Sequence, residues 1–163
     1  WEAYPTGQNE VLRLTQNQVG YSYRAVVSYI DSHGTREVLY TSPSETIDNL
    51  DDPVQGEVTI IGEPKEGVTL RALSNSLSDE DGIASISISW ETSKDGRNWV
   101  GVNSLSGPIL SLGQSLVGSQ VRARVAVVDN FGIETNLYSQ ATRTVENVNN
   151  KPSGRIVIRR VGQ

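Results

Sequence analysis

The chain repeats itself at a spacing of 98 residues, and this period constrains its fold more than any other feature. When residues 1–65 are laid over residues 99–163 without a gap, 17 of the 65 positions are identical. Unrelated sequences of this composition would share about 4. The pattern TIDNLDDPVQG at 46–56 returns as TVENVNNKPSG at 144–154. Such a period is typical of an array of similar domains joined by short linkers.

The period sets the expected domain boundaries. We expect residues 1–47 to be the rear half of one repeat and residues 48–53 to be an acidic linker. Residues 54–151 are expected to form a complete repeat, and residues 152–163 the first strand of a third. One repeat of this size can bury its own core. The incomplete first repeat lacks its front strands, so it cannot close a sandwich by itself.

Alternation of apolar and polar residues predicts short strands throughout the complete repeat. In the clearest example, Ile86, Ile88 and Trp90 alternate with serines, as in a strand with one apolar face. Other strands are expected at 57–63, 68–74, 99–102, 109–112, 121–128 and 134–145. Seven strands without helical periodicity predict an all-β fold, namely immunoglobulin-like (cadherin-like) seven-strand β-sandwich repeats in tandem.

Composition and charge argue against several functions. The chain has no cysteine, so neither disulfides nor thiolate metal ligands are available. Its net charge of −5 disfavours nucleic acid. No apolar run approaches the roughly 20 residues of a membrane-spanning helix, so membrane insertion is not expected. The single histidine, His33, lies in a turn and is replaced by Phe131 in the other copy. The chain is therefore predicted not to be an enzyme.

Three acidic segments are predicted to meet at one end of the sandwich. They are the linker, the loop at 78–83 and the loop at 129–132, which share the end where the chain enters such a domain. Close carboxylates repel unless a cation neutralises them, and Ca²⁺ accepts six to eight oxygen ligands. A single histidine without cysteine disfavours zinc and copper. The predicted calcium ligands are Asp48, Asp51, Asp52, Asp79, Asp81 and Asp129.

One other interpretation of these acidic segments remains open. Asp, Asn and Gly favour turns for backbone reasons, so solvated loops without a metal are the plain alternative. The second linker has Glu146 but asparagines at 147, 149 and 150, so it carries less charge than the first. It is expected to bind calcium less tightly or not at all.

Four stretches of the sequence carry a family resemblance. They are GEVTIIGEPKEGVTLRA, LSDEDGIASISISW, LVGSQVRARVAVVDNFG and VENVNNKPSG. With them the chain resembles the tandem immunoglobulin-like or cadherin-like repeats of large bacterial surface proteins, including RTX-type adhesins. The resemblance implies secretion to the bacterial surface or medium, stacking against neighbouring repeats, and calcium at the joints. Asn149, Asn150 and Lys151 depart from the acidic pattern of such a joint.

The resulting functional prediction is a non-catalytic structural spacer of a secreted bacterial adhesin or RTX-like protein. Interdomain calcium would stiffen the array and hold a distal domain, which binds a host-surface or matrix glycan or protein, away from the cell. The alternative is a carbohydrate-binding sandwich module of a secreted polysaccharide-active protein. That alternative rests on Tyr21, Tyr23, Tyr29 and Tyr40, whose rings could stack on sugars. Tyrosines also suit strands for packing reasons alone.

Overall fold

The computed structural model describes residues 1–2 and 11–159, except for the side chains of residues 103–105. The contacts divide the chain into two units, residues 1–53 and 54–163. Within the described residues the regular structure is nearly all β, in antiparallel sheets, with two single-turn 3-10 helices. The prediction of an all-β fold is confirmed at this level.

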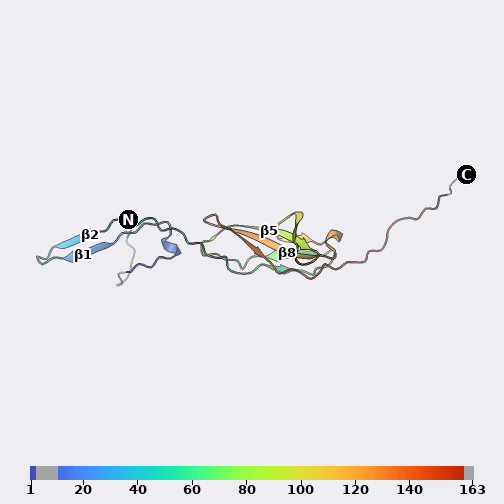
Figure 1. The fold of residues 1–163 in the computed structure, drawn as a ribbon, viewed down its shortest axis with the longest axis horizontal. Coiled ribbons are helices and arrows are strands. Elements are labelled where there is room, and N and C mark those ends of the chain that lie inside the picture. The colour runs from blue at the N-terminus through green and yellow to red at the C-terminus, as the bar shows by residue number, and fades with distance from the viewer. Residues whose placement is uncertain (3–10, 160–163) are drawn as a thin grey trace. The chain divides into compact units, whose positions relative to one another are not determined.

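The second unit contains two antiparallel sheets (Figure 1). The three-stranded sheet has the order β3-β4-β7 and comprises β3 (Thr59–Ile61), β4 (Thr69–Leu73) and β7 (Ile109–Ser111). The four-stranded sheet has the order β6-β5-β8-β9 and comprises β6 (Val100–Ser106), β5 (Ile83–Ser93), β8 (Gln120–Asp129) and β9 (Glu134–Tyr138). The 3-10 helix η2 (Gln114–Leu116) connects the two sheets.

The core lies between the two sheets, and β8 supplies its longest buried face. Alternate residues of β8 are buried, which is the period-two pattern expected at 121–128. They form one apolar cluster with Leu70 and Leu110 of the three-stranded sheet and with Trp90 of β5. The indole Nε1 of Trp90 donates a hydrogen bond of 3.0 Å to the carbonyl of Gly107. The buried tryptophan therefore keeps its polar atom satisfied.

Burial along β5 differs from the alternation expected from sequence. Trp90 is buried and Ile88 is partly buried, but Ile86 is exposed. Ile86 pairs with the buried Val127 of β8 on one side. On its other side β6 pairs with β5 only from Ser89 to Thr92, so the edge of β5 beside Ile86 lies open in the described part of the chain.

The last strand is shorter than expected because side chains replace part of its ladder. β9 ends at Tyr138, although residues up to 145 were expected to continue it. Beyond it, the hydroxyl oxygens of Ser139 and Thr142 accept the backbone N–H groups of Ala123 and Val121 at 2.9 and 3.1 Å. Regular pairing stops there, while the chain remains attached to β8.

The first unit contains the 3-10 helix η1 (Gln16–Gln18) and the antiparallel hairpin of β1 (Val26–Ile30) and β2 (Arg36–Tyr40). Its hydrogen bonds match those of the second unit at the 98-residue spacing. Gly20 N–H donates to the carbonyl of Ile47 at 2.9 Å, and Gly118 N–H donates to that of Val145 at 3.0 Å. The sequence period thus coincides with repeated local bonding.

Residues 151–159 form no strand, and residues 160–163 lie outside the described part of the chain. The opening strand expected at 152–163 therefore stays a prediction. No described helix has the length and apolar character needed to cross a membrane.

Neighbouring residues of β7 provide a matched test of the core. Leu110 is 0% exposed and Ile109 is 55% exposed on the opposite face. We expect Leu110→Ala to lower the free energy of unfolding by about 2–5 kcal/mol, because it leaves a cavity. Ile109→Ala should lower the free energy of unfolding by well under half of that amount. Equal losses in denaturant unfolding would contradict this assignment of faces.

The turn between β5 and β6 provides a pH test. Hydrogen bonds from the backbone N–H groups of Asn98 and Arg97, and from the Asn98 and Ser93 side chains, lower the pKa of Asp95 from its ordinary value. A lowered pKa in the folded state stabilises the fold above the unfolded pKa and loses that effect as the pH falls. We expect Asp95→Asn to lower the melting temperature at about pH 7 and to have less effect at about pH 2. If the wild type and Asp95→Asn differed in melting temperature as much at low pH as at about pH 7, this stabilising role of the Asp95 carboxylate would be contradicted.

Candidate metal site

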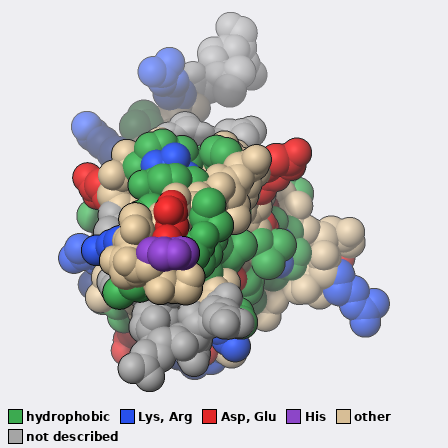
Figure 2. Space-filling model, turned by 90° about the vertical axis from the view of Figure 1, so that its left-hand side faces the viewer, with side chains coloured by type: hydrophobic (Ala, Val, Ile, Leu, Met, Phe, Trp, Pro, Cys, Tyr) green, Lys and Arg blue, Asp and Glu red, His purple; other side chains and the backbone are tan. Residues whose placement is uncertain are grey.

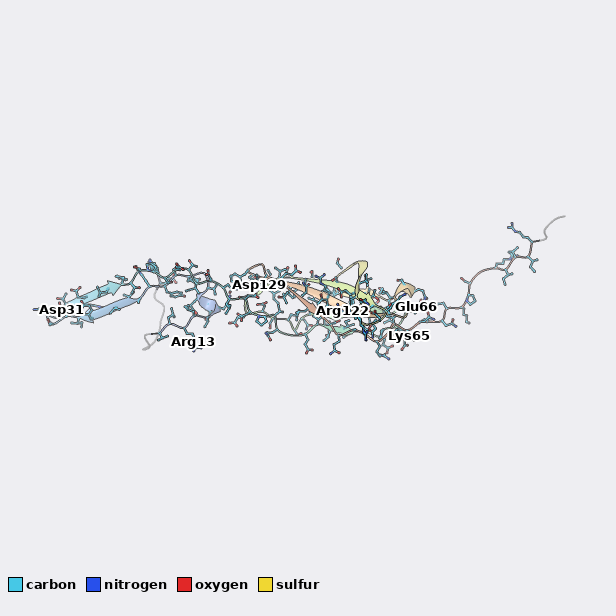
Figure 3. All side chains as sticks on the ribbon, in the orientation of Figure 1. Arg13, Asp31, Lys65, Glu66, Arg122 and Asp129 are labelled. Atoms are coloured by element: carbon cyan, nitrogen blue, oxygen red, sulfur yellow. The ribbon has the colours of Figure 1, made fainter. Side chains whose placement is uncertain are left out.

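The candidate metal site lies at one end of the second unit, where β8 stops and β5 begins. Ile83, the first residue of β5, pairs with Asp129, the last residue of β8. The loop before β5 and the turn after β8 are therefore neighbours. Figure 3 shows Asp129 at this end of the unit and Lys65 and Glu66 at the opposite end.

Asp129 is a buried carboxylate, 3% exposed, with one oxygen used by the fold. Its Oδ1 accepts the backbone N–H groups of Phe131 at 2.8 Å and Ile133 at 2.7 Å, which closes the turn between β8 and β9. Its Oδ2 is buried and has no hydrogen-bond partner among the described residues. A buried carboxylate oxygen without a partner is costly, so it calls for a cation or another donor.

Asp81 brings a second buried carboxylate to the same place. It is 4% exposed, and an oxygen of its carboxylate lies within 4.8 Å of one from Asp129. Two negative charges at this separation repel each other strongly in a buried setting. Two ligands of one calcium ion lie at most about 5 Å apart, since each Ca–O distance is 2.3–2.6 Å. The pair therefore fits a shared cation in both charge and spacing.

Asp79 shapes the loop that holds Asp81. Its Oδ1 accepts the backbone N–H of Asp81 at 2.9 Å, and its carbonyl accepts the N–H of Gly82 at 3.0 Å. These bonds form a tight turn in which Asp79 itself is only partly buried. Its assignment as a metal ligand stays a prediction.

The linker residues of the predicted set belong to the first unit. Asp48 and Asp51 are exposed and Asp52 is partly buried. Their assignment as ligands also stays a prediction. Within the second unit, Gln55 exchanges two backbone hydrogen bonds with Ser78, of 2.7 and 3.0 Å. The entering chain is thereby fixed beside the loop that carries Asp81.

Gly82 and Asn130 form a close contact that sequence reasoning did not identify. Gly82 has a φ of +81°, and a Cβ atom built there would overlap Nδ2 of Asn130. The loop before β5 and the turn after β8 therefore touch through a position without a side chain. The only sequence signal was the pairing of glycine with aspartate in SDEDG, which is typical of any turn.

The opposite end of the second unit holds the outgoing segment. The Oε2 atom of Glu66 accepts the backbone N–H of Val148 at 3.0 Å. The carbonyl of Glu146 accepts the N–H of Glu66 at 2.9 Å, and Glu146 N–H donates to the carbonyl of Pro64 at 2.8 Å. The start of the second linker is thus tied to the turn between β3 and β4.

The residues around His33 make contacts within their own turn. The ring Nδ1 lies 3.3 Å from the hydroxyl of Ser32. Asp31 accepts the backbone N–H of His33 at 2.9 Å. The carboxylate thus shapes the turn, as Asp129 does in the second unit.

Comparison of the sequence with models of protein families and with curated proteins gave no match. The second unit is an all-β domain with two buried carboxylates at one end.

Two glycine substitutions test the contact between the loops. Gly82 and Gly132 both have positive φ, but only Gly82 faces a close neighbour. Each change to alanine should lower the free energy of unfolding by about 1 kcal/mol through backbone strain. Gly82→Ala should cost more, because Asn130 must also move. Equal losses in thermal unfolding would show that Asn130 gives way without cost.

Proposed function

We propose that this chain is a non-catalytic structural spacer of a secreted bacterial adhesin or RTX-like protein, built from tandem immunoglobulin-like repeats. Calcium bound where one repeat meets the next would stiffen the array. The observation that carries the proposal is the buried Oδ2 atom of Asp129, which lacks a hydrogen-bond partner among the described residues and has Asp81 close by. The resemblance to repeats of bacterial surface proteins supports the same conclusion.

The proposed calcium ligands come from the sandwich and from the linker before it. Asp81 and Asp129 supply buried carboxylate oxygens from the second unit. Asp51 is the linker ligand that we favour. Three residues separate it from Gln55, which is anchored beside Ser78. That segment spans at most about 14 Å, so the linker can reach the loop.

Further oxygens would complete the coordination shell. Calcium takes six to eight, which leaves room for Asp79, Asp48, Asp52, backbone carbonyls and water. Bound calcium supplies positive charge that neutralises the buried carboxylates. A ligand drawn from the linker would also restrict the backbone freedom of that linker, at a cost of about 1–2 kcal/mol per fixed residue. The binding free energy would offset this cost when calcium is abundant outside the cell.

The anchoring of the outgoing segment supports a mechanical role. Hydrogen bonds with Glu66 and with the carbonyl of Pro64 hold residues 146–148 against their own repeat. The direction in which the chain leaves is therefore set by the sandwich. A spacer needs this property, because freedom at either end of a repeat would add flexibility to the whole array. Neighbouring repeats of the same chain are the expected partners.

Carbohydrate binding remains a second candidate because Tyr21, Tyr29 and Tyr40 are exposed. Arg24 lies over the ring of Tyr40, at 4.6 Å from its centroid, and so occupies one face of that ring. Val127, the counterpart of Tyr29 at the 98-residue spacing, is buried. The exposure of Tyr29 is thus explained by the open face of the hairpin. A saturable calorimetric signal with soluble glycans, lost in Tyr21→Ala, would favour the sugar-binding function.

Thermal unfolding with and without calcium tests the proposed site. We expect calcium to raise the melting temperature of the wild type, and this rise to disappear in Asp129→Asn. Asparagine retains a side-chain oxygen for the N–H groups of Phe131 and Ile133, so the turn survives while the charge is lost. Glu80→Gln, which changes an exposed acid in the same loop, is the matched control. An equal calcium-induced rise in the melting temperatures of Asp129→Asn and the wild type would contradict calcium binding at this site.

Asp51→Asn separates a joint site from a site inside one domain. If calcium links the linker to the sandwich, Asp51→Asn should reduce the calcium-induced rise in melting temperature. If calcium raised the melting temperature of Asp51→Asn as much as that of the wild type, and did not raise that of Asp129→Asn, calcium would bind within the sandwich alone. The stiffening mechanism would then be wrong.

A further inference from the structure

We propose that the hydrogen bonds between residues 64–66 and 146–148, which we call the terminal clamp, hold the second unit folded when its two ends are pulled apart. The clamp joins the first segment of this unit directly to its last segment. Its use in the cell rests on the proposed spacer function, because a spacer between a cell and a bound surface is under tension. The clamp itself involves no calcium, so it can be tested separately from the calcium site.

The clamp consists of two backbone hydrogen bonds and one bond to a side chain. Glu146 donates its N–H to the carbonyl of Pro64 at 2.8 Å, and its own carbonyl accepts the N–H of Glu66 at 2.9 Å. Glu146 thus bonds to the residues on both sides of Lys65, which is the pattern of a parallel bridge. The third bond joins the N–H of Val148 to Oε2 of Glu66 at 3.0 Å. A charged acceptor makes a hydrogen bond stronger than a neutral one does.

The two joined segments run in the same direction along the unit. The first passes from Gln55, at the end that holds Asp129, through β3 to the turn at 64–66. The last begins after the turn at Asp129 and passes through β9 to Glu146. Figure 3 shows Asp129 at one end of the unit and Glu66 at the other. Outward pulls on the two segments therefore act along the strands, in opposite directions.

The clamp also determines which part of the chain is under tension. The other six described strands of the second unit lie between the turn at 64–66 and residue 146 in the sequence. Tension that enters at Gln55 passes along β3, crosses the clamp and leaves through Val148. These six strands are therefore bypassed while the clamp holds, and they come under tension only after it breaks.

The parallel arrangement makes the clamp bonds break together. When two strands slide past each other lengthwise, every bond between them is stretched at the same time. When two strands are opened from one end, as in an antiparallel hairpin, the bonds break in sequence. Breaking several bonds in one step presents a higher barrier, because each of them contributes to the same transition state. A pull along the unit is therefore the direction in which the clamp resists most.

The last segment is fixed to the sandwich up to the residue before the clamp. The N–H of Val145 donates to the carbonyl of Ser119 at 2.8 Å, and Val145 is 2% exposed. The same bond occurs in the first unit at the 98-residue spacing, where the N–H of Ile47 donates to the carbonyl of Tyr21 at 2.9 Å. Anchoring of the outgoing segment is therefore a property of the repeat. It keeps residues 146–148 aligned with the turn at 64–66.

Single-molecule force measurement on the full chain tests the clamp, with a calcium chelator present throughout. The chain has no cysteine, so two introduced thiols are its only attachment points. Glu57→Cys with Asn150→Cys applies force along the strands. Arg97→Cys with Asn150→Cys applies force from the turn between β5 and β6, which lies at the same end as the clamp because β5 begins opposite Asp129. The second pair therefore opens the clamp from one side.

The lifetime of the folded unit under constant force is the quantity to compare. We expect it to be about tenfold longer when the unit is pulled along the strands, because several hydrogen bonds must then break together. All three attachment residues are exposed, so the thiols should not disturb the fold. Equal lifetimes in the two directions at the same force would overturn the proposal.

Two controls show whether a change acts on the clamp alone. Thermal unfolding without force establishes that each variant is folded at the start. The single histidine, His33, lies at the surface of the first unit, where Figure 2 shows it. Its ring signals in NMR spectra should be the same in every variant, because all the changes lie in the second unit. The chelator keeps calcium from the acidic site, so a failure of the clamp leaves the calcium-induced rise in melting temperature untouched.

Two glutamates of one turn provide matched variants. Glu66→Ala removes the oxygen that accepts the N–H of Val148, and Glu63→Ala changes an exposed acid of the same turn. We expect Glu66→Ala to shorten the lifetime about tenfold when the unit is pulled along the strands, because a bond to a charged acceptor is lost. Glu63→Ala should leave the lifetime unchanged. Equal lifetimes of the two variants would overturn the proposal, and if Glu66→Ala does not fold, the comparison of pulling directions decides.

Discussion

The antiparallel ladder between β5 and β8 is the interaction on which the rest of the second unit depends. Its register places alternate β8 residues in the core and Trp90 opposite Ala123. The same register sets Ile83 against Asp129 at one end, which brings Asp81 to the buried carboxylate. It also aligns Glu91 with Arg122. A slip of one residue would move every side chain of one strand to the opposite face of the sheet. It would therefore disrupt both the core packing and the pairing of the two buried carboxylates.

The first unit shows which contacts form without such a ladder among its described residues. Its hairpin keeps the turn closed by Asp31, and its arginine keeps its place between two aromatic rings. The Asp31 contacts are local, whereas Arg24 also contacts Trp1, which lies outside the hairpin. The apolar face stays exposed because burial requires strands that the described part of this unit does not contain. Local hydrogen bonding and core formation are thus separable in this repeat, and only the second requires distant segments.

Much of the fold could be predicted because its signals are local. Alternation predicted the buried face of β8. The exposure of Ile86 could not be predicted, because it depends on where β6 stops pairing with β5. Likewise, Asp79 and Asp81 look equivalent in SDEDG. Their difference arises from a hydrogen bond that commits the first to the loop and from the packing that buries the second.

The sequence by itself determined the strand pattern, the turns closed by aspartate, and the period that relates β1–β2 to β8–β9. These follow from backbone preferences and from the spacing of apolar residues within short segments. Tertiary structure alone decided which carboxylates are buried together, which oxygen of Asp129 lacks a donor among the described residues, and which face of the hairpin is left open. The physical reason is that burial and unsatisfied polar atoms depend on groups far apart in the chain, whose separation no local pattern encodes.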